Sequence, residues 1–321
     1  MAEPLKATFF TLKHRDRAVL LPATLVMIVL VALIVAAWAA LNWRMFALMF
    51  ELTQLGSGQA NEEQALAMFS GMMGLFLSTF LLLIPLYIVV AAYEAACLRW
   101  MIRGEAPGLF GLTLNNDTWR VWGVYWCWLV TNLAISMVAG MLMMPLTFMM
   151  MGDIIAQAPK EPDPAMMWNL QLKLQALSLI QYIPMIFIGV RFGPAAATSI
   201  ARRRFSFFEA WTVTSERFWA LLGSFAVLWL IAGAAMIAAA VPLTLRMWPY
   251  FEAMWREPSD ATMQAYFQAY LAPENLMWAG AGYVVVVVAW LWLSLMSFGV
   301  NARAALAALE EGKIQETAPE T

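Results

Sequence analysis

Long runs of uncharged, mainly apolar residues follow one another along the chain, separated by short segments that hold the charges. Five runs exceed the roughly 20 residues that a helix needs to cross about 30 Å of hydrocarbon. A sixth run is shorter and continues past one charge, Arg191. The pattern predicts about six transmembrane helices. We place them at residues 18–43, 64–98, 119–151, 170–201, 216–246 and 275–306.

These spans predict an all-α fold, a polytopic helical membrane bundle that forms one transmembrane domain over residues 1–312. The composition agrees, because 63% of the residues are hydrophobic and only 12% are charged. Soluble domains have about 45–50% and about 25%, and a soluble fold could not bury so much apolar surface. The last residues, 313–321, are mostly polar and are predicted to form a disordered tail.

The first apolar run has an alternative interpretation as a cleavable signal peptide, because Ala37-Trp38-Ala39 resembles a cleavage site. The run is 26 residues long, whereas the apolar part of a signal peptide has about 7–15 residues. We therefore predict a permanent membrane helix.

Lys and Arg are divided unevenly between the two sides of the predicted bundle. Of the 19, counting Arg191, 14 lie at the two termini and in the connections after the second and fourth spans. Cytoplasmic loops of membrane proteins are enriched in these residues. The sequence therefore predicts a bacterial inner-membrane protein with both termini in the cytoplasm. The net charge of −2 implies no attraction to nucleic acid, and no such partner is expected.

Short motifs recur weakly at intervals near 100 residues. Ile84-Pro85 corresponds to Ile183-Pro184, and Met144-Pro145 corresponds to Val241-Pro242. This recurrence is consistent with three two-helix repeats in parallel. Chance similarity among apolar helices is the alternative explanation.

The connection after the fourth span has an aromatic pattern with a helical period. Phe207, Trp211 and Phe218 fall on one helical face, and three arginines precede them. Basic residues beside an aromatic face suit an anionic leaflet. The candidate contacts with anionic lipid are Arg202, Arg203, Arg204 and Trp211. The alternative is a passive linker that lies at the membrane surface.

The connection between the fifth and sixth spans predicts a short helix on the other side of the membrane. Ser259 is placed to cap its N-terminus, and Pro273 ends it.

Residues that commonly carry catalysis are scarce. His14 is the single histidine, which excludes His-assisted nucleophiles and multi-His metal centres. No phosphate-loop or nucleophile-elbow motif occurs. The 24 methionines are soft ligands for Cu(I), but without paired Cys or His we interpret them as packing residues. Cys97 and Cys127 lie inside spans and do not suggest a disulfide framework. We predict no enzymatic activity, no cofactor and no metal.

One pair of charged residues within the predicted spans stands out. Glu94 lies near the end of the second span, and Arg191 occupies almost the equivalent position in the fourth. A charge in hydrocarbon costs several kcal/mol unless it is paired or reaches the interface. We therefore predict an intramembrane ion pair between Glu94 and Arg191. The alternative is that each side chain extends separately to the nearby membrane surface.

Residues 191–195, 206–214 and 218–223 resemble the R-x-x-x-P-A, S-F-x-E-A-W-x-x-T and W-x-L-L-G motifs of a broad group of bacterial membrane proteins, with Pro194 one position early. That group is similar to the membrane domain fused to some glycerophosphoryl diester phosphodiesterases. Residues 103–108 look like its first cytoplasmic linker. The resemblance covers roughly residues 80–230 and implies a helical bundle with lipid-related work. The phosphodiesterase catalytic domain, with its His and acidic ligands, is missing.

The sequence favours an integral inner-membrane protein without chemistry of its own, acting as a lipid-associated or partner-binding subunit. Its expected partners are membrane lipids and other membrane proteins. A small transporter or permease is the first alternative, and a membrane enzyme is the second. A transporter would be expected to carry polar residues at mid-span in corresponding repeats, and only scattered ones occur, such as Thr131, Asn132 and Ser136.

Overall fold

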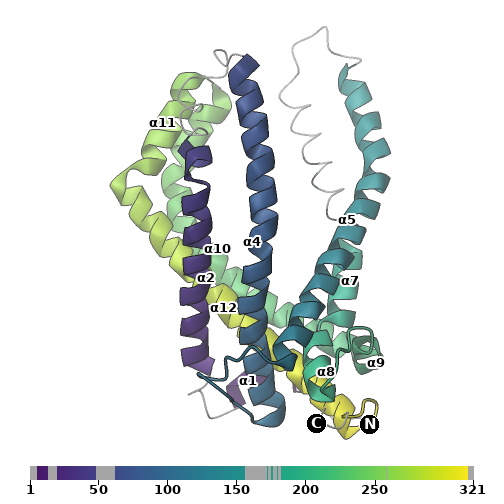
Figure 1. Ribbon diagram of the computed structural model, residues 1–321. Coiled ribbons are helices and arrows are strands. Elements are labelled where there is room, and N and C mark those ends of the chain that lie inside the picture. Colours follow the sequence, from purple (N-terminus) through teal and green to yellow (C-terminus); the bar gives the residue numbers. More distant parts are fainter. Residues whose placement is uncertain are drawn as a thin grey trace.

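The computed structural model describes residues 6–13, 20–47, 62–155, 182–257 and 259–316, with the single residues 172, 175 and 179. The named elements in this part of the chain are all helices (Figure 1). They are α1 (Phe10–Lys13), α2 (Leu20–Leu41), α4 (Glu62–Arg103), α5 (Asn116–Ile155), α7 (Tyr182–Phe192), α8 (Ala195–Arg202), α9 (Ala210–Thr214), α10 (Phe218–Arg256), α11 (Asp260–Leu271) and α12 (Pro273–Glu310).

Six segments are long and apolar enough to cross a membrane. They are Leu20–Leu41, Phe69–Arg103, Asn116–Pro145, Tyr182–Arg202, Phe218–Arg256 and Pro273–Glu310. Large apolar side chains along these helices point outward, and Leu25, Phe76, Leu142, Trp229 and Tyr283 are each 61% to 72% exposed. Exposing apolar surface to water costs about 25 cal/mol per Å², whereas hydrocarbon accepts it. The predicted all-α polytopic bundle with six spans is confirmed, and the protein is an integral membrane protein.

The buried core lies at one end of the bundle. This end, which we call the terminus end, holds α1, α8, α9 and both ends of the described chain (Figure 1). Its fully buried side chains come from α4, α5, α8, α10 and α12, and include Leu98, Val121, Ile200, Leu221 and Val300. Toward the opposite end α4 and α5 diverge (Figure 1). The terminus end is therefore the best-packed part of the protein.

Small residues allow this close packing. Gly299 of α12 lies against α1, where an added Cβ would come within 2.1 Å of Thr11 Oγ1 and 2.8 Å of its backbone nitrogen. Thr11 Oγ1 donates to the carbonyl oxygen of Leu295 at 2.9 Å. Close approach of helices at small residues is a common packing mode in membranes. Gly299 is thus what lets α1 lie directly on the last span.

The fourth span is interrupted. Helix α7 ends at Phe192, and α8 begins at Ala195 after Gly193 and Pro194. The proline has no N–H to continue the helical hydrogen bonds, but it is tolerated at a helix start. The chain then turns at Arg203, which has a left-handed conformation with φ of 57°. The predicted span of 170–201 is therefore two helices, and most of residues 170–181 lie outside the described residues.

Helix α11 agrees with its sequence prediction. Ser259 caps it by accepting a hydrogen bond from the Thr262 backbone nitrogen at 3.2 Å, and the Thr262 side chain accepts from the Ser259 backbone nitrogen at 3.1 Å. Pro273 then begins α12 instead of continuing α11. These reciprocal bonds satisfy donors at the helix N-terminus that would otherwise be unpaired.

Residues 313–316 contradict the predicted disordered tail. Gly312, with φ of 69°, ends α12 and lets the Lys313 nitrogen donate to the carbonyl oxygen of Ala308 at 2.9 Å. Ile314 is only 5% exposed, and Lys313 Nζ lies 2.6 Å from Glu216 Oε2. The mostly polar composition of this segment gave no indication that Ile314 is buried and anchors the chain. Residues 317–321 lie outside the described residues.

Candidate functional site

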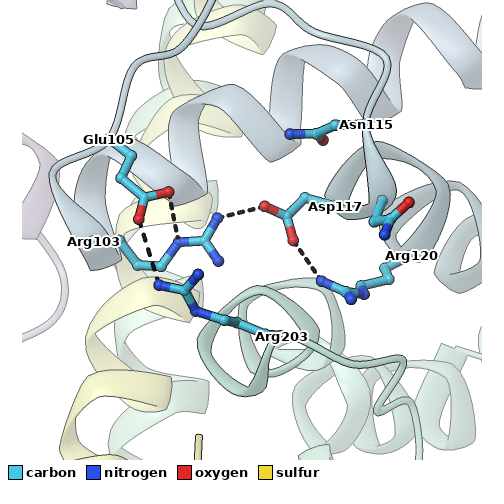
Figure 2. A pocket seen from close by; sticks show the side chains of 7 residues that line it. Arg103, Glu105, Asn115, Asp117, Arg120 and Arg203 are labelled. Carbon is cyan, nitrogen blue, oxygen red and sulfur yellow. Dashed lines mark hydrogen bonds and ion pairs between the residues drawn. The ribbon is translucent and has the colours of Figure 1, made fainter. Parts of the chain in front are cut away.

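A polar pocket lies at the terminus end, where the second, third and fourth spans meet the connections between them (Figure 2). Its volume is about 440 Å³, and it is partly open. The lining side chains come from the end of α4, the start of α5 and the turn after α8. They are Arg103, Glu105, Asn115, Asn116, Asp117, Arg120 and Arg203.

Asp117 is the centre of the charge arrangement. Its side chain is 7% exposed and pairs with Arg103, with Arg120 Nη1 at 2.8 Å and with Arg99 Nη1 at 3.7 Å. Figure 2 shows Arg103 and Arg120 converging on this carboxylate from two helices. The side chains of Arg99, Arg103 and Arg120 are 0%, 11% and 15% exposed. One carboxylate thus holds three largely buried guanidinium groups.

Arg99 is fully buried beside Asp117 and fixes the connection between α4 and α5. It donates to Asn115 Oδ1 at 2.6 Å, to the carbonyl oxygen of Gly111 at 2.7 Å and to Thr113 Oγ1 at 3.0 Å. Asn115 Oδ1 also accepts from the backbone nitrogen of Thr118 at 3.3 Å, which satisfies a donor in the first turn of α5. Arg99 therefore positions the loop and the start of the third span together.

Glu105 and Arg203 complete the pocket on its more exposed side. Glu105 lies 3.2 Å from Arg103 Nε and 3.5 Å from Arg203 Nη2, and it is 44% exposed. Arg203 Nε also donates to Glu316 Oε1 at 2.5 Å, and this hydrogen bond raises the pKa of Arg203. The lining thus carries three arginines and two carboxylates, a surplus of one positive charge before the buried Arg99 is added.

The structure does not bring Glu94 and Arg191 together. In the described part of the chain no ion pair joins them. Glu94 is 6% exposed and accepts a hydrogen bond from Tyr125 Oη at 2.5 Å. The second and fourth spans do pack together, but through α8, whereas α7 packs on α9 and α10. The break after Phe192 separates Arg191 from the half-helix that contacts α4, and the predicted ion pair is absent.

Arg191 is held by aromatic rings instead. Its guanidinium carbon lies 4.8 Å from the ring centre of Trp211, 4.9 Å from Phe218 and 5.5 Å from Phe187. Arg191 Nη1 donates a hydrogen bond to the carbonyl oxygen of Thr214 at 3.1 Å. In return, Thr214 Oγ1 donates to the carbonyl oxygen of Arg191, also at 3.1 Å. A cation above ring faces is attracted by their quadrupoles. Arg191 thereby fastens α9 and the start of α10 to α7.

The three consecutive arginines have acidic partners. Arg202 Nη1 and Arg204 Nη2 lie 2.8 Å and 3.0 Å from Glu209 Oε1, while Arg203 binds Glu105 and Glu316. Burial raises the pKa of Glu209, but backbone hydrogen bonding and the arginines outweigh it, so the net pKa is lowered. This surface is less basic than its sequence suggests.

The predicted amphipathic helix of this connection is mostly wrong. Between Phe205 and Arg217 only Ala210–Thr214 are helical, and Phe218 already belongs to α10. Phe207 is 3% exposed and stacks on Phe192, with ring centres 5.0 Å apart. The turn at Arg203 folds this segment onto the protein, which buries part of the face expected to meet lipid. Trp211 remains 43% exposed.

The sequence interpretation missed the pocket. Arg103 and Arg120 entered the prediction as basic residues that set the topology, and Asp117 was not considered as a site residue. The available signal was the concentration of charge on both sides of one short connection, with acidic and basic residues three positions apart at the start of α5. Such residues meet only if α4 and α5 pack at their ends, which the sequence does not show.

The fold and site define a multi-pass helical membrane protein with an arginine-rich pocket at one end. No family model, no curated protein and no solved structure matches this chain. Within the described residues, no group of three His, Cys, Asp or Glu side chains is placed to hold a metal ion.

Proposed function

We propose that this protein is a non-catalytic subunit of the bacterial inner membrane that associates with anionic phospholipid through its terminus end. That end faces the cytoplasm in this proposal, because 14 of the 19 basic residues belong to it or to its connections. The resemblance to membrane domains fused to phosphodiesterases supports lipid-related work, and it is carried by the motifs in these same connections.

The observation that carries the proposal is the placement of exposed aromatic side chains beside the arginines. Phe208 and Trp219 are 74% and 79% exposed, and they lie within a few residues of Arg204 and Arg217. Aromatic rings of this kind favour the headgroup level of a bilayer. Guanidinium groups bind phosphate by parallel N–H donors. The combination matches an anionic phospholipid, with its chain beside the rings and its phosphate beside the cations.

Lipid that co-purifies with the protein in mild detergent tests this proposal. Phosphatidylglycerol should be enriched over phosphatidylethanolamine relative to the whole membrane, as measured by mass spectrometry. The double variant Phe208→Ser, Trp219→Ser should weaken the affinity for anionic lipid about thirtyfold, because the two exposed rings each contribute on the order of 1 kcal/mol at an interface. The matched control is Phe267→Ser, since Phe267 is 56% exposed on α11. Equal retention by both variants would contradict the proposal.

A small transporter is the second candidate, and Glu94 is the observation that favours it. This carboxylate lies inside a span and is 6% exposed, with the Tyr125 hydroxyl as its hydrogen-bond donor. Buried carboxylates in spans often serve ion pathways. In liposomes with an imposed pH gradient, this candidate requires a proton flux that Glu94→Gln abolishes. A flux equal to that of protein-free liposomes would eliminate a proton-coupled transporter.

A further inference from the structure

We propose that the pocket bounded by Arg103, Arg120 and Arg203 is a binding site for a phosphate group, either a lipid phosphate or a soluble phosphate ester. For a lipid ligand this inference rests on the proposed function and names the group that is recognised. For a soluble ligand the inference is independent of the proposed function.

The pocket has the donors that a phosphate needs. Arg103 and Arg203 approach it from the ends of α4 and α8, and Arg120 approaches from α5 (Figure 2). Arginine presents a rigid fork of N–H groups that matches phosphate oxygens. Asn115 and Asn116 add polar side chains at the rim. Three guanidinium groups, each from a different span, therefore surround a single volume of about 440 Å³.

Asp117 orients these arginines without neutralising them. It holds Arg103 and Arg120 from one side, and the carbonyl oxygen of Ile200 accepts from Arg103 Nη1 at 3.4 Å. With Arg99 included, three cations surround this single carboxylate. Clustered guanidinium groups of low exposure repel one another, and an anion would relieve that repulsion. On the open side, Arg103 Nε is paired with the 44% exposed Glu105 at 3.2 Å.

The start of α5 also favours an anion. Asn116 and Asp117 belong to the first turn of this 40-residue helix and line the pocket. Helix N-termini carry partial positive charge and unpaired N–H groups, which bind phosphate. The N-terminus of α5 and the arginines therefore both favour an anion in the pocket.

Two exposed carboxylates compete with the ligand. Glu105 lies between Arg103 and Arg203, and Glu316 occupies Arg203 Nε. Both are 44% or more exposed, so either can turn into solvent at small cost. An arriving phosphate would take the place of Glu105. Removal of that charge should therefore strengthen binding.

The experiment measures thermal unfolding of the full chain in neutral detergent, with inorganic phosphate or glycerol 3-phosphate titrated against chloride at equal ionic strength. Phosphate should raise the unfolding midpoint of the unmodified protein. Arg203→Gln should weaken the apparent Kd about tenfold, the usual loss for one charge-assisted contact. Glu105→Gln should tighten it about fivefold by removing a nearby like charge. Arg256→Gln is the control, because Arg256 is a 75% exposed arginine at the end of α10 and does not line the pocket.

A parallel arm identifies the source of the phosphate. The protein is placed in nanodiscs that contain phosphatidylcholine with or without phosphatidic acid, and retained lipid is measured for the same variants. Retention of phosphatidic acid that follows the Arg203→Gln and Glu105→Gln pattern assigns the site to a lipid. If the two variants change the binding of soluble phosphate but not the retention of phosphatidic acid, the site is assigned to a soluble phosphate ester.

The results that would contradict a phosphate site in this pocket differ from those that would contradict the proposed function. No stabilisation by phosphate, or equal responses of Arg203→Gln and Arg256→Gln with no gain from Glu105→Gln, would overturn the phosphate site. Anionic lipid could still co-purify in that case, which would leave the proposed function intact. A misfolded variant cannot mimic the result, because Glu105→Gln is expected to bind more tightly.

Discussion

Replacing Asp117 by Asn is expected to lower the free energy of unfolding by about 3–5 kcal/mol, the usual cost of removing one partner from a buried ion pair. The carboxylate is 7% exposed and pairs with Arg99, Arg103 and Arg120. Asparagine keeps the size of the side chain but removes the charge. Three guanidinium groups of low exposure would then lie together without the carboxylate that they share. Denaturant unfolding in detergent, followed by circular dichroism, measures the loss.

The control for this prediction is an ion pair outside the core. Glu252 pairs with Arg256 at 2.5 Å on α10, where the two side chains are 42% and 75% exposed. Exposed pairs contribute about 0–1 kcal/mol, so Glu252→Gln should have little effect. Adding Arg120→Gln to Asp117→Asn should recover part of the stability, because it removes one of the three clustered cations. An Asp117→Asn variant as stable as Glu252→Gln would show that the pocket charges are solvated and independent.

The membrane spans could be predicted because their signal is local. A helix in hydrocarbon must satisfy its backbone internally and keep charges out, so length and absence of charge suffice. The capped helix α11 was predictable for the same reason, since Ser259 and Thr262 act within one turn. These features need no knowledge of what packs against them.

The site could not be predicted in the same way, because its parts come from three spans. Arg103, Asp117 and Arg203 meet only because α8 packs on α4 and α5. That packing depends on the break at Gly193 and Pro194, which the sequence interpretation placed inside one continuous span, residues 170–201. The rotation of each helix about its axis decides which side chains face each other, and apolar spans give little sequence signal for it.

Glu94 and Arg191 illustrate this limit and give the second large effect. Their similar positions in the weak repeat imply similar depth but not a shared face. The structure gives Glu94 a tyrosine hydroxyl and gives Arg191 the rings of Trp211 and Phe218. An ion pair and two separate environments predict different results when both residues are replaced, so a double-mutant cycle separates them.

We expect Arg191→Gln to destabilise the protein by about 2–4 kcal/mol, because it removes a charged hydrogen bond to the Thr214 carbonyl oxygen and the attraction of the rings. Arg191→Lys should recover little of this, since an ammonium group lacks the planar fork that lies on the rings. Glu94→Gln should change stability by less than about 1 kcal/mol, because the amide oxygen can still accept from Tyr125 and a buried charge is removed. The two changes should add within about 0.5 kcal/mol. A coupling energy above about 1 kcal/mol would mean that the two charges do interact in the membrane, which would restore the ion pair and place α7 beside α4.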